Sequence, residues 1–192
     1  MSTLRALPLL LSCLIGAPAS AATVGGRDFP ERISVPGVGS NLRLSGAAVL
    51  DRNYVPFYTA ALYVPASVRS ADQLLSGMAP YRMTVVWQIP ALDGDRVDDY
   101  WRKAFSDAAG AERLPRIKGQ VDRFVAIFDE ARHGQTILFD YIPDGGMRIY
   151  IDDQPGGQLA GVEFNKILTA IWLGDNAPRE FRGALLARIA AE

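Results

Sequence analysis

Strand-type and helix-type patterns occur in separate blocks along this chain of 192 residues, and their order limits the possible folds. The segments 41–50 and 54–64 are rich in aliphatic residues, Tyr and Thr, and only residues 51–53 separate them, which predicts a β-hairpin. A further strand is predicted over residues 83–89, ending at Pro90. Because strands and helices are grouped and do not alternate repeatedly as βαβα, the sequence predicts an α+β domain. Its antiparallel sheet would carry helices on one face, as in an open-faced sandwich.

The second half of the chain extends this pattern. Apolar residues recur at helical spacing over residues 95–108, which predicts an amphipathic helix with Asp95 as its N-cap. Period two then returns and predicts an antiparallel meander of three strands, at 124–128, 137–142 and 147–151, before a turn at 152–157. Two closing helices follow, the first over 164–172 with Gly174 as a left-handed cap, and the second beginning at Pro178.

The N-terminal residues 1–21 have the order of a secretory signal peptide: one basic residue, the apolar stretch 6–15, and the small residues 19–21. The apolar stretch is about half of the ~20 residues that span a bilayer, so we expect no transmembrane segment in the mature chain. Residues 22–192 then form one domain, which we expect to be periplasmic or secreted. A lipoprotein with an acylated Cys13 is the alternative, although the apolar stretch before that residue would be very short.

Composition excludes several functions. With 20 basic and 21 acidic residues interspersed, the chain has no field that would attract nucleic acid. A single Cys and a single His cannot build a zinc site, and the acidic pairs at 98–99 and 152–153 lack the spacing of a calcium loop. No Gly-x-Ser-x-Gly motif is present, and His133 falls in a predicted solvated turn. We therefore expect no metal and no cofactor.

Several segments, in the same order along the chain, carry a family resemblance. They are the hairpin segments 44–48 and 57–63, the strand 145–151, the helix 161–174 ending in Ile-Trp-Leu-Gly, and the helix 178–186. Together they resemble the bacterial, exported branch of the chalcone isomerase-like family. The resemblance implies a cleft between sheet and helices that accepts a flat or elongated apolar molecule. Plant members close a chalcone to a flavanone, while related proteins bind fatty acids or act as non-catalytic helpers.

The resemblance also implies that the catalytic cation is missing. In the enzymes an Arg follows the Gly-Ala-Gly of the opening hairpin, and the matching position here is Leu50. Arg52 lies two residues further and would face the same side of a strand, although it falls in the predicted turn; Arg43 is the other substitute. The helix that carries Tyr and Asn in the enzymes offers Val97 and Ala104.

The remaining candidate ligand-binding residues also come from the resemblance. Tyr58 lies close to the position at which the enzymes carry a hydroxyl group on the second strand, and Thr59 is the alternative if the register differs by one residue. Asn165 and Thr169 fall on the penultimate helix, whose counterpart in the enzymes carries further polar contacts. Without a functional role, Tyr58 would be a core aromatic, Asn165 an outward residue and Thr169 a neutral helix position.

Three functional hypotheses follow. The first is an exported, non-catalytic binder of a small hydrophobic ligand such as a fatty acid, with Arg52, Tyr58 or Thr59 at the head group. The second is an intramolecular lyase acting on a chalcone-like enone, which needs a replacement for the missing cation. The third is a cell-envelope interaction module whose cleft is filled by side chains.

Overall fold

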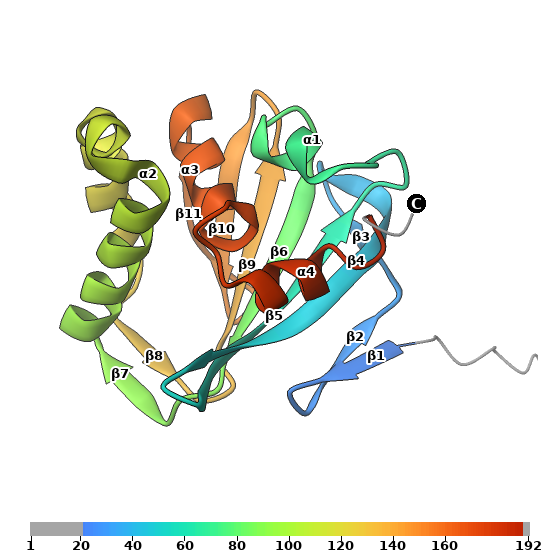
Figure 1. The fold of residues 1–192 in the computed structure, drawn as a ribbon, viewed down its shortest axis with the longest axis horizontal. Coiled ribbons are helices and arrows are strands. Elements are labelled where there is room, and N and C mark those ends of the chain that lie inside the picture. The colour runs from blue at the N-terminus through green and yellow to red at the C-terminus, as the bar shows by residue number, and fades with distance from the viewer. Residues whose placement is uncertain (1–20, 190–192) are drawn as a thin grey trace, which may run out of the picture.

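A seven-stranded antiparallel sheet is the centre of the molecule (Figure 1). The computed structural model describes residues 21–189, so the predicted signal peptide lies outside the described residues except for Ala21. The strands lie in the order β11-β10-β9-β6-β5-β4-β3. Their bounds are β3 (Arg32–Val35), β4 (Gly39–Arg52), β5 (Val55–Val64), β6 (Tyr81–Trp87), β9 (Thr136–Ile142), β10 (Gly146–Ile151) and β11 (Gln154–Leu159).

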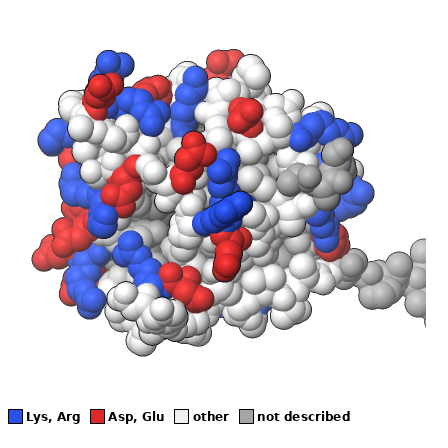
Figure 2. Space-filling view, viewed as in Figure 1, with Lys and Arg blue, Asp and Glu red and all other residues white. Residues whose placement is uncertain are grey.

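Helices cover one face of this sheet, which confirms the predicted fold class (Figure 1). They are α1 (Ala71–Leu75), α2 (Gly94–Val125), α3 (Val162–Leu173) and α4 (Arg179–Leu185). Aromatic side chains fill most of the space between helices and sheet. The fully buried members include Trp87, Trp101, Phe105, Phe124, Phe139, Phe164 and Trp172. Acidic and basic side chains are interspersed over this side of the molecule (Figure 2).

The opposite face carries a smaller core. A hairpin of β1 (Ala21–Val24) and β2 (Arg27–Pro30) packs there, and its Phe29 joins Leu42, Leu44, Tyr63 and other apolar residues of β3, β4 and β5. A separate two-stranded ladder, β7 (Ala91–Asp93) with β8 (Glu130–Arg132), lies at the N-terminal end of α2. Among the described residues, no helix combines the length and apolar character needed to cross a membrane.

The predicted strand at 124–128 is wrong, because α2 continues to Val125. Phe124 and Phe128 are four residues apart, so their apparent alternation also fits a helix, and both rings stay in the core. The helix is broken once, at Gly110 (φ 68°, ψ 171°), a backbone conformation that favours glycine. The Arg113 guanidinium donates to the backbone oxygens of residues 108 and 109, which the break leaves without helical partners. Arg113 therefore stabilises the break.

Three smaller expectations also change. The N-cap of α2 is Asp93, whose carboxylate accepts from the Arg96 backbone N–H at 3.0 Å, and not Asp95. The turn after β10 is shorter than predicted, because β11 already begins at Gln154 and pairs with β10. Gly174 ends α3 with an extended φ of −78° instead of a left-handed one.

Candidate ligand-binding site

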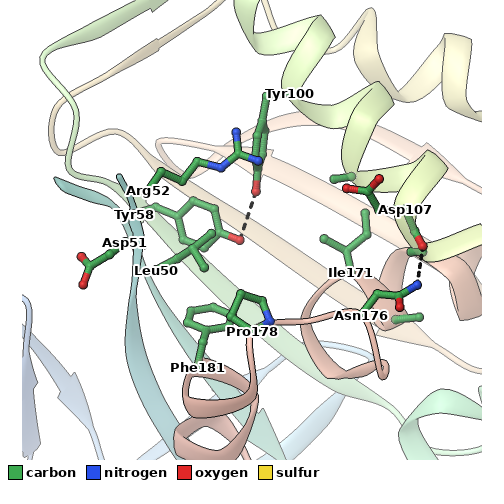
Figure 3. A pocket seen from close by; sticks show the side chains of 13 residues that line it. Leu50, Asp51, Arg52, Tyr58, Tyr100, Asp107, Ile171, Asn176, Pro178 and Phe181 are labelled. Atoms are coloured by element: carbon green, nitrogen blue, oxygen red, sulfur yellow. Dashed lines mark hydrogen bonds between the residues drawn. The ribbon is translucent and has the colours of Figure 1, made fainter. Parts of the chain in front are cut away.

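A cavity of about 190 Å³ opens between the end of the β4–β5 hairpin and helices α2, α3 and α4 (Figure 3). Its lining combines apolar residues with a few polar groups. The lining residues are Leu50, Asp51, Arg52, Tyr58, Tyr100, Ala104, Asp107, Ala108, Ala170, Ile171, Asn176, Pro178 and Phe181. Leu50 and Tyr58 are paired across β4 and β5, so the sheet pleat directs both side chains to the helix side.

Two tyrosine hydroxyls meet at this cavity. Tyr100 of α2 donates a hydrogen bond to the Tyr58 hydroxyl of β5 at 3.1 Å. Burial raises the pKa of Tyr58 to about 12, although the hydrogen bond from Tyr100 and the charge of Arg52 act in the opposite direction. Burial also raises the pKa of Tyr100 well above its ordinary value. Both groups therefore stay neutral at physiological pH, and Tyr58 keeps its own hydroxyl hydrogen to donate to a ligand.

A cation stands beside these hydroxyls. The Arg52 guanidinium lies 5.2 Å from the Phe57 ring centroid and 4.9 Å from that of Tyr100, in cation–π geometry. β4 extends through Arg52, so this residue is the last of the strand and not part of the turn, and its side chain reaches toward Tyr100 (Figure 3). Among the described residues, no carboxylate pairs with Arg52. Its charge is therefore available to an anion.

The other polar groups of the lining are occupied or directed elsewhere. The Asp107 carboxylate accepts from Lys103 Nζ at 2.8 Å, and the Asn176 side-chain amide donates to the Asp107 backbone oxygen at 2.6 Å. The Asp51 carboxylate points away from the cavity (Figure 3). Arg52 and Tyr58 are thus the groups that can bind a polar head, while Leu50 and Phe181 supply apolar contacts.

Thr59 does not line this cavity. It follows Tyr58 in β5, so its side chain points to the opposite face of the sheet, under the turn of the β1–β2 hairpin. There its hydroxyl accepts from the Gln88 side-chain amide at 2.9 Å, and the same amide donates to the Gly25 backbone oxygen at 3.2 Å. The register of the hairpin therefore selects Tyr58 as the hydroxyl on the cavity side.

Asn165 and Thr169 also lie outside the cavity lining. Both are about 2% exposed, so the interpretation of Asn165 as an outward residue is wrong. The Thr169 hydroxyl donates to the Asn165 backbone oxygen at 2.8 Å, and it therefore accepts from the Tyr81 hydroxyl, also at 2.8 Å. These bonds fix α3 against β6. Asn165 Oδ1 is buried and has no hydrogen-bond partner among the described residues.

Sequence reasoning missed Tyr100 and Asn176. The family resemblance matched the polar positions of the enzymes' helix to Val97 and Ala104, which are both apolar. Tyr100 lies one helical turn from each and brings its hydroxyl to the same cavity. The spacing was a usable signal, but an aromatic residue on an apolar helix face is indistinguishable from core. Asn176 lies in an irregular loop for which the periodicity gave no information.

The described residues contain no cluster of three or more His, Cys, Asp or Glu side chains that could hold a metal. His133 is exposed near a separate, open hollow with Arg132 and Asp152. The chemistry of the cavity is therefore that of its cation, its hydroxyls and its apolar walls.

Comparison with known proteins agrees with this architecture. A family model described as chalcone isomerase-like matches residues 21–187, so the chain belongs to the chalcone isomerase-like family. Among solved structures, a fatty-acid binding protein of Arabidopsis thaliana has a similar fold, with a TM-score of 0.73 over 90% of this chain and 100% of that one. At 13% identity, this likeness shows a shared fold alone. Comparison with curated protein sequences finds no match.

Proposed function

We propose that the protein is an exported, non-catalytic binder of a small amphiphile. An anionic head would lie between Arg52 and Tyr58, and the apolar part against Leu50, Ile171 and Phe181. One observation carries the proposal: a cation without an acidic partner among the described residues and a neutral hydroxyl with a free hydrogen adjoin the apolar wall of one cavity. The Arabidopsis thaliana protein of similar fold, which is described as fatty-acid binding, supports a ligand of this class.

The size of the cavity restricts the apolar part. Pockets that bury most of a drug-sized ligand have volumes of about 300–1,000 Å³, whereas this one measures about 190 Å³. The aromatic core occupies the rest of the space between helices and sheet. A short acyl chain or a single ring fits this space better than a long chain does.

An intramolecular lyase remains the second candidate, because Arg52 lines the same cavity as Leu50, the residue at the cation position of the enzymes. Arg52, Tyr58 and Tyr100 would then stabilise negative charge on an enone oxygen. This activity predicts turnover of a chalcone that is lost in Arg52→Ala. A pure binder predicts ligand retention without turnover.

The proposal is tested on the mature protein purified from a periplasmic fraction. Its intact mass should correspond to residues 22–192, and denaturing mass spectrometry should detect a released acyl or aromatic acid. Calorimetric titration with octanoate should show affinity reduced about tenfold or more in Tyr58→Phe and in Arg52→Gln, because each removes one charge-assisted interaction.

The matched control is Tyr54→Phe, which removes the same atom from a fully exposed side chain at the hairpin tip. Its affinity should equal that of the unchanged protein. A folded protein that carries no released molecule and binds neither octanoate nor an aromatic acid would contradict the proposal. Co-purification of a protein partner would then favour an envelope interaction module.

A further inference from the structure

A second hollow adjoins the cavity on the other side of Arg52 and Tyr100. It has a volume of about 270 Å³ and is more open to solvent. Arg52 and Tyr100 line both hollows, so a ligand whose head binds Arg52 in the cavity would lie at the entrance of the second one. The two hollows differ in the charged side chains that line them: the cavity has one cation, Arg52, and the second hollow has three.

Three cations and one carboxylate line the second hollow. Arg96, Tyr100 and Lys103 are spaced at i, i+4 and i+7 along α2, so they share one face of the helix, and Arg52 approaches that face from β4. Asp99 is the acidic member. Lys103 is partly compensated by Asp107, whereas no carboxylate pairs with Arg96 or Arg52 in the part of the chain that the structure describes.

This charge exceeds what a carboxylate head requires. Arg52 and the Tyr58 hydroxyl already satisfy the two oxygens and the single charge of a carboxylate. Arg96 and Lys103 would then remain as uncompensated or partly compensated cations next to it. A phosphate monoester carries about −1.5 to −2 charges near neutral pH and three acceptor oxygens. Three cations and the carboxylate of Asp99 give this lining a formal net charge of 3 − 1 = +2, which a phosphate monoester matches better than a carboxylate does.

We propose that the ligand is a short-chain phosphate monoester, with its apolar chain in the cavity and its phosphate in the second hollow against Arg52, Arg96 and Lys103. This inference rests on the proposed binding function and specifies its ligand class. Simple alkyl phosphates and glycerol-linked lipid phosphates share this chemistry, and they differ in whether a polar linker separates the chain from the phosphate.

The test is a calorimetric comparison of octyl phosphate with octanoate, which have matched chain lengths, at pH 8 and at low salt. Octyl phosphate should bind about tenfold more tightly, because it gains at least one additional charge-assisted interaction. Arg96→Gln should remove most of that advantage while changing octanoate affinity less than about twofold. The advantage should also shrink at pH 6, where the phosphate has lost about half of its second charge while the carboxylate of octanoate stays mostly ionised.

Arg102→Gln is the matched control, since it removes the same charge from α2 at a position paired with Asp98 and Asp122 outside the hollow. It should leave both affinities unchanged. An octanoyl-chain lysophosphatidic acid distinguishes the two sources, because tighter binding than octyl phosphate would indicate a glycerol-linked ligand.

Equal binding of octyl phosphate and octanoate would overturn the phosphate assignment and leave the proposed binding function intact. Tighter phosphate binding that Arg96→Gln does not affect would overturn the assignment of the second hollow. Binding of neither ligand would contradict the proposed function itself.

Discussion

Tyr58 and Tyr100 determine how the cavity responds to pH. Both side chains are buried, and burial raises both pKa values, that of Tyr58 to about 12. Burial also raises the pKa of Tyr63 to about 12, and that of Tyr81 further. In the unfolded chain these groups ionise near their ordinary value of about 10. The folded state therefore holds more protons than the unfolded state at alkaline pH.

The resulting prediction is a loss of stability above pH 10. Folded pKa values above the unfolded ones stabilise the protein fully below pH 10, and the stabilisation is lost as pH rises through about 12. Each tyrosine contributes a slope of up to about 1.4 kcal/mol per pH unit in this window. Urea unfolding at pH 9 to 12 should show a steep fall, and Tyr58→Phe should reduce the slope while the exposed-site variant Tyr54→Phe does not. A flat profile would mean that the buried tyrosines ionise within the folded protein.

The sequence identified some of these residues and not others, for physical reasons. Arg52 and Tyr58 were found because a strand places every second residue on one face, and the resemblance indicated which face. Thr59 was a candidate only because register was unknown, and the pairing of Leu50 with Tyr58 excludes it from the cavity. Tyr100 was missed because its role depends on packing between α2 and β5, which are distant in sequence.

At the scale of elements, α4 closes the cavity because its C-terminal end is fixed on β4. The buried Ser45 hydroxyl donates to the Leu185 backbone oxygen at 2.8 Å, and the Arg188 guanidinium pairs with Glu31. Gly46 allows the closest approach, since a Cβ atom there would lie 1.9 Å from the Ala184 backbone oxygen. Helix and strand can therefore pack this tightly only with glycine at position 46.

This contact predicts opposite effects for two substitutions of the same kind. Gly46→Ala should destabilise the protein by about 1–3 kcal/mol, because α4 must move away from β4. Gly183→Ala lies in α4 with no atom within 4 Å of the added Cβ, and it should stabilise the protein by about 0.5–1 kcal/mol through helix propensity. Thermal unfolding of both variants measures the difference. A neutral Gly46→Ala would show that α4 is not held against β4.

Helices and strands were predictable from the sequence where the apolar residues followed a single periodicity, either that of a helix or that of a strand. The β4–β5 hairpin and α3 match their predictions closely because their apolar patterns run without interruption. The second half of α2 was not predictable, because Gly110 and Pro115 look like loop signals and Phe124 and Phe128 satisfy both periods. The Arg113 side chain that caps the break makes its contribution only in the folded chain.

At the scale of the whole molecule, the aromatic core and the cavity share the space between one sheet face and its helices. The rings of Trp101, Phe105 and Trp172 are completely buried, so they limit how far a ligand chain can penetrate. Phe181 of α4 forms part of the cavity wall, and its ring centroid lies 6.0 Å from that of Tyr58. The volume available to a ligand is therefore determined by a few large side chains and not by the fold.

Chain-length dependence tests this division of space. In a series of straight-chain acids, affinity should rise by about 0.8 kcal/mol for each methylene that is buried, and then reach a plateau once the cavity of about 190 Å³ is full. Phe181→Leu should extend the rise to longer chains because it enlarges the cavity. It should cost less stability than Phe181→Ala, which removes about 3–5 kcal/mol of packing.

Phe128→Leu is the control, since it replaces a buried aromatic ring that does not line the cavity with a smaller side chain. Calorimetry on the three proteins should show the same plateau for Phe128→Leu as for the unchanged protein. A continuous rise through dodecanoate in the unchanged protein would show instead that the aromatic core opens to admit the chain.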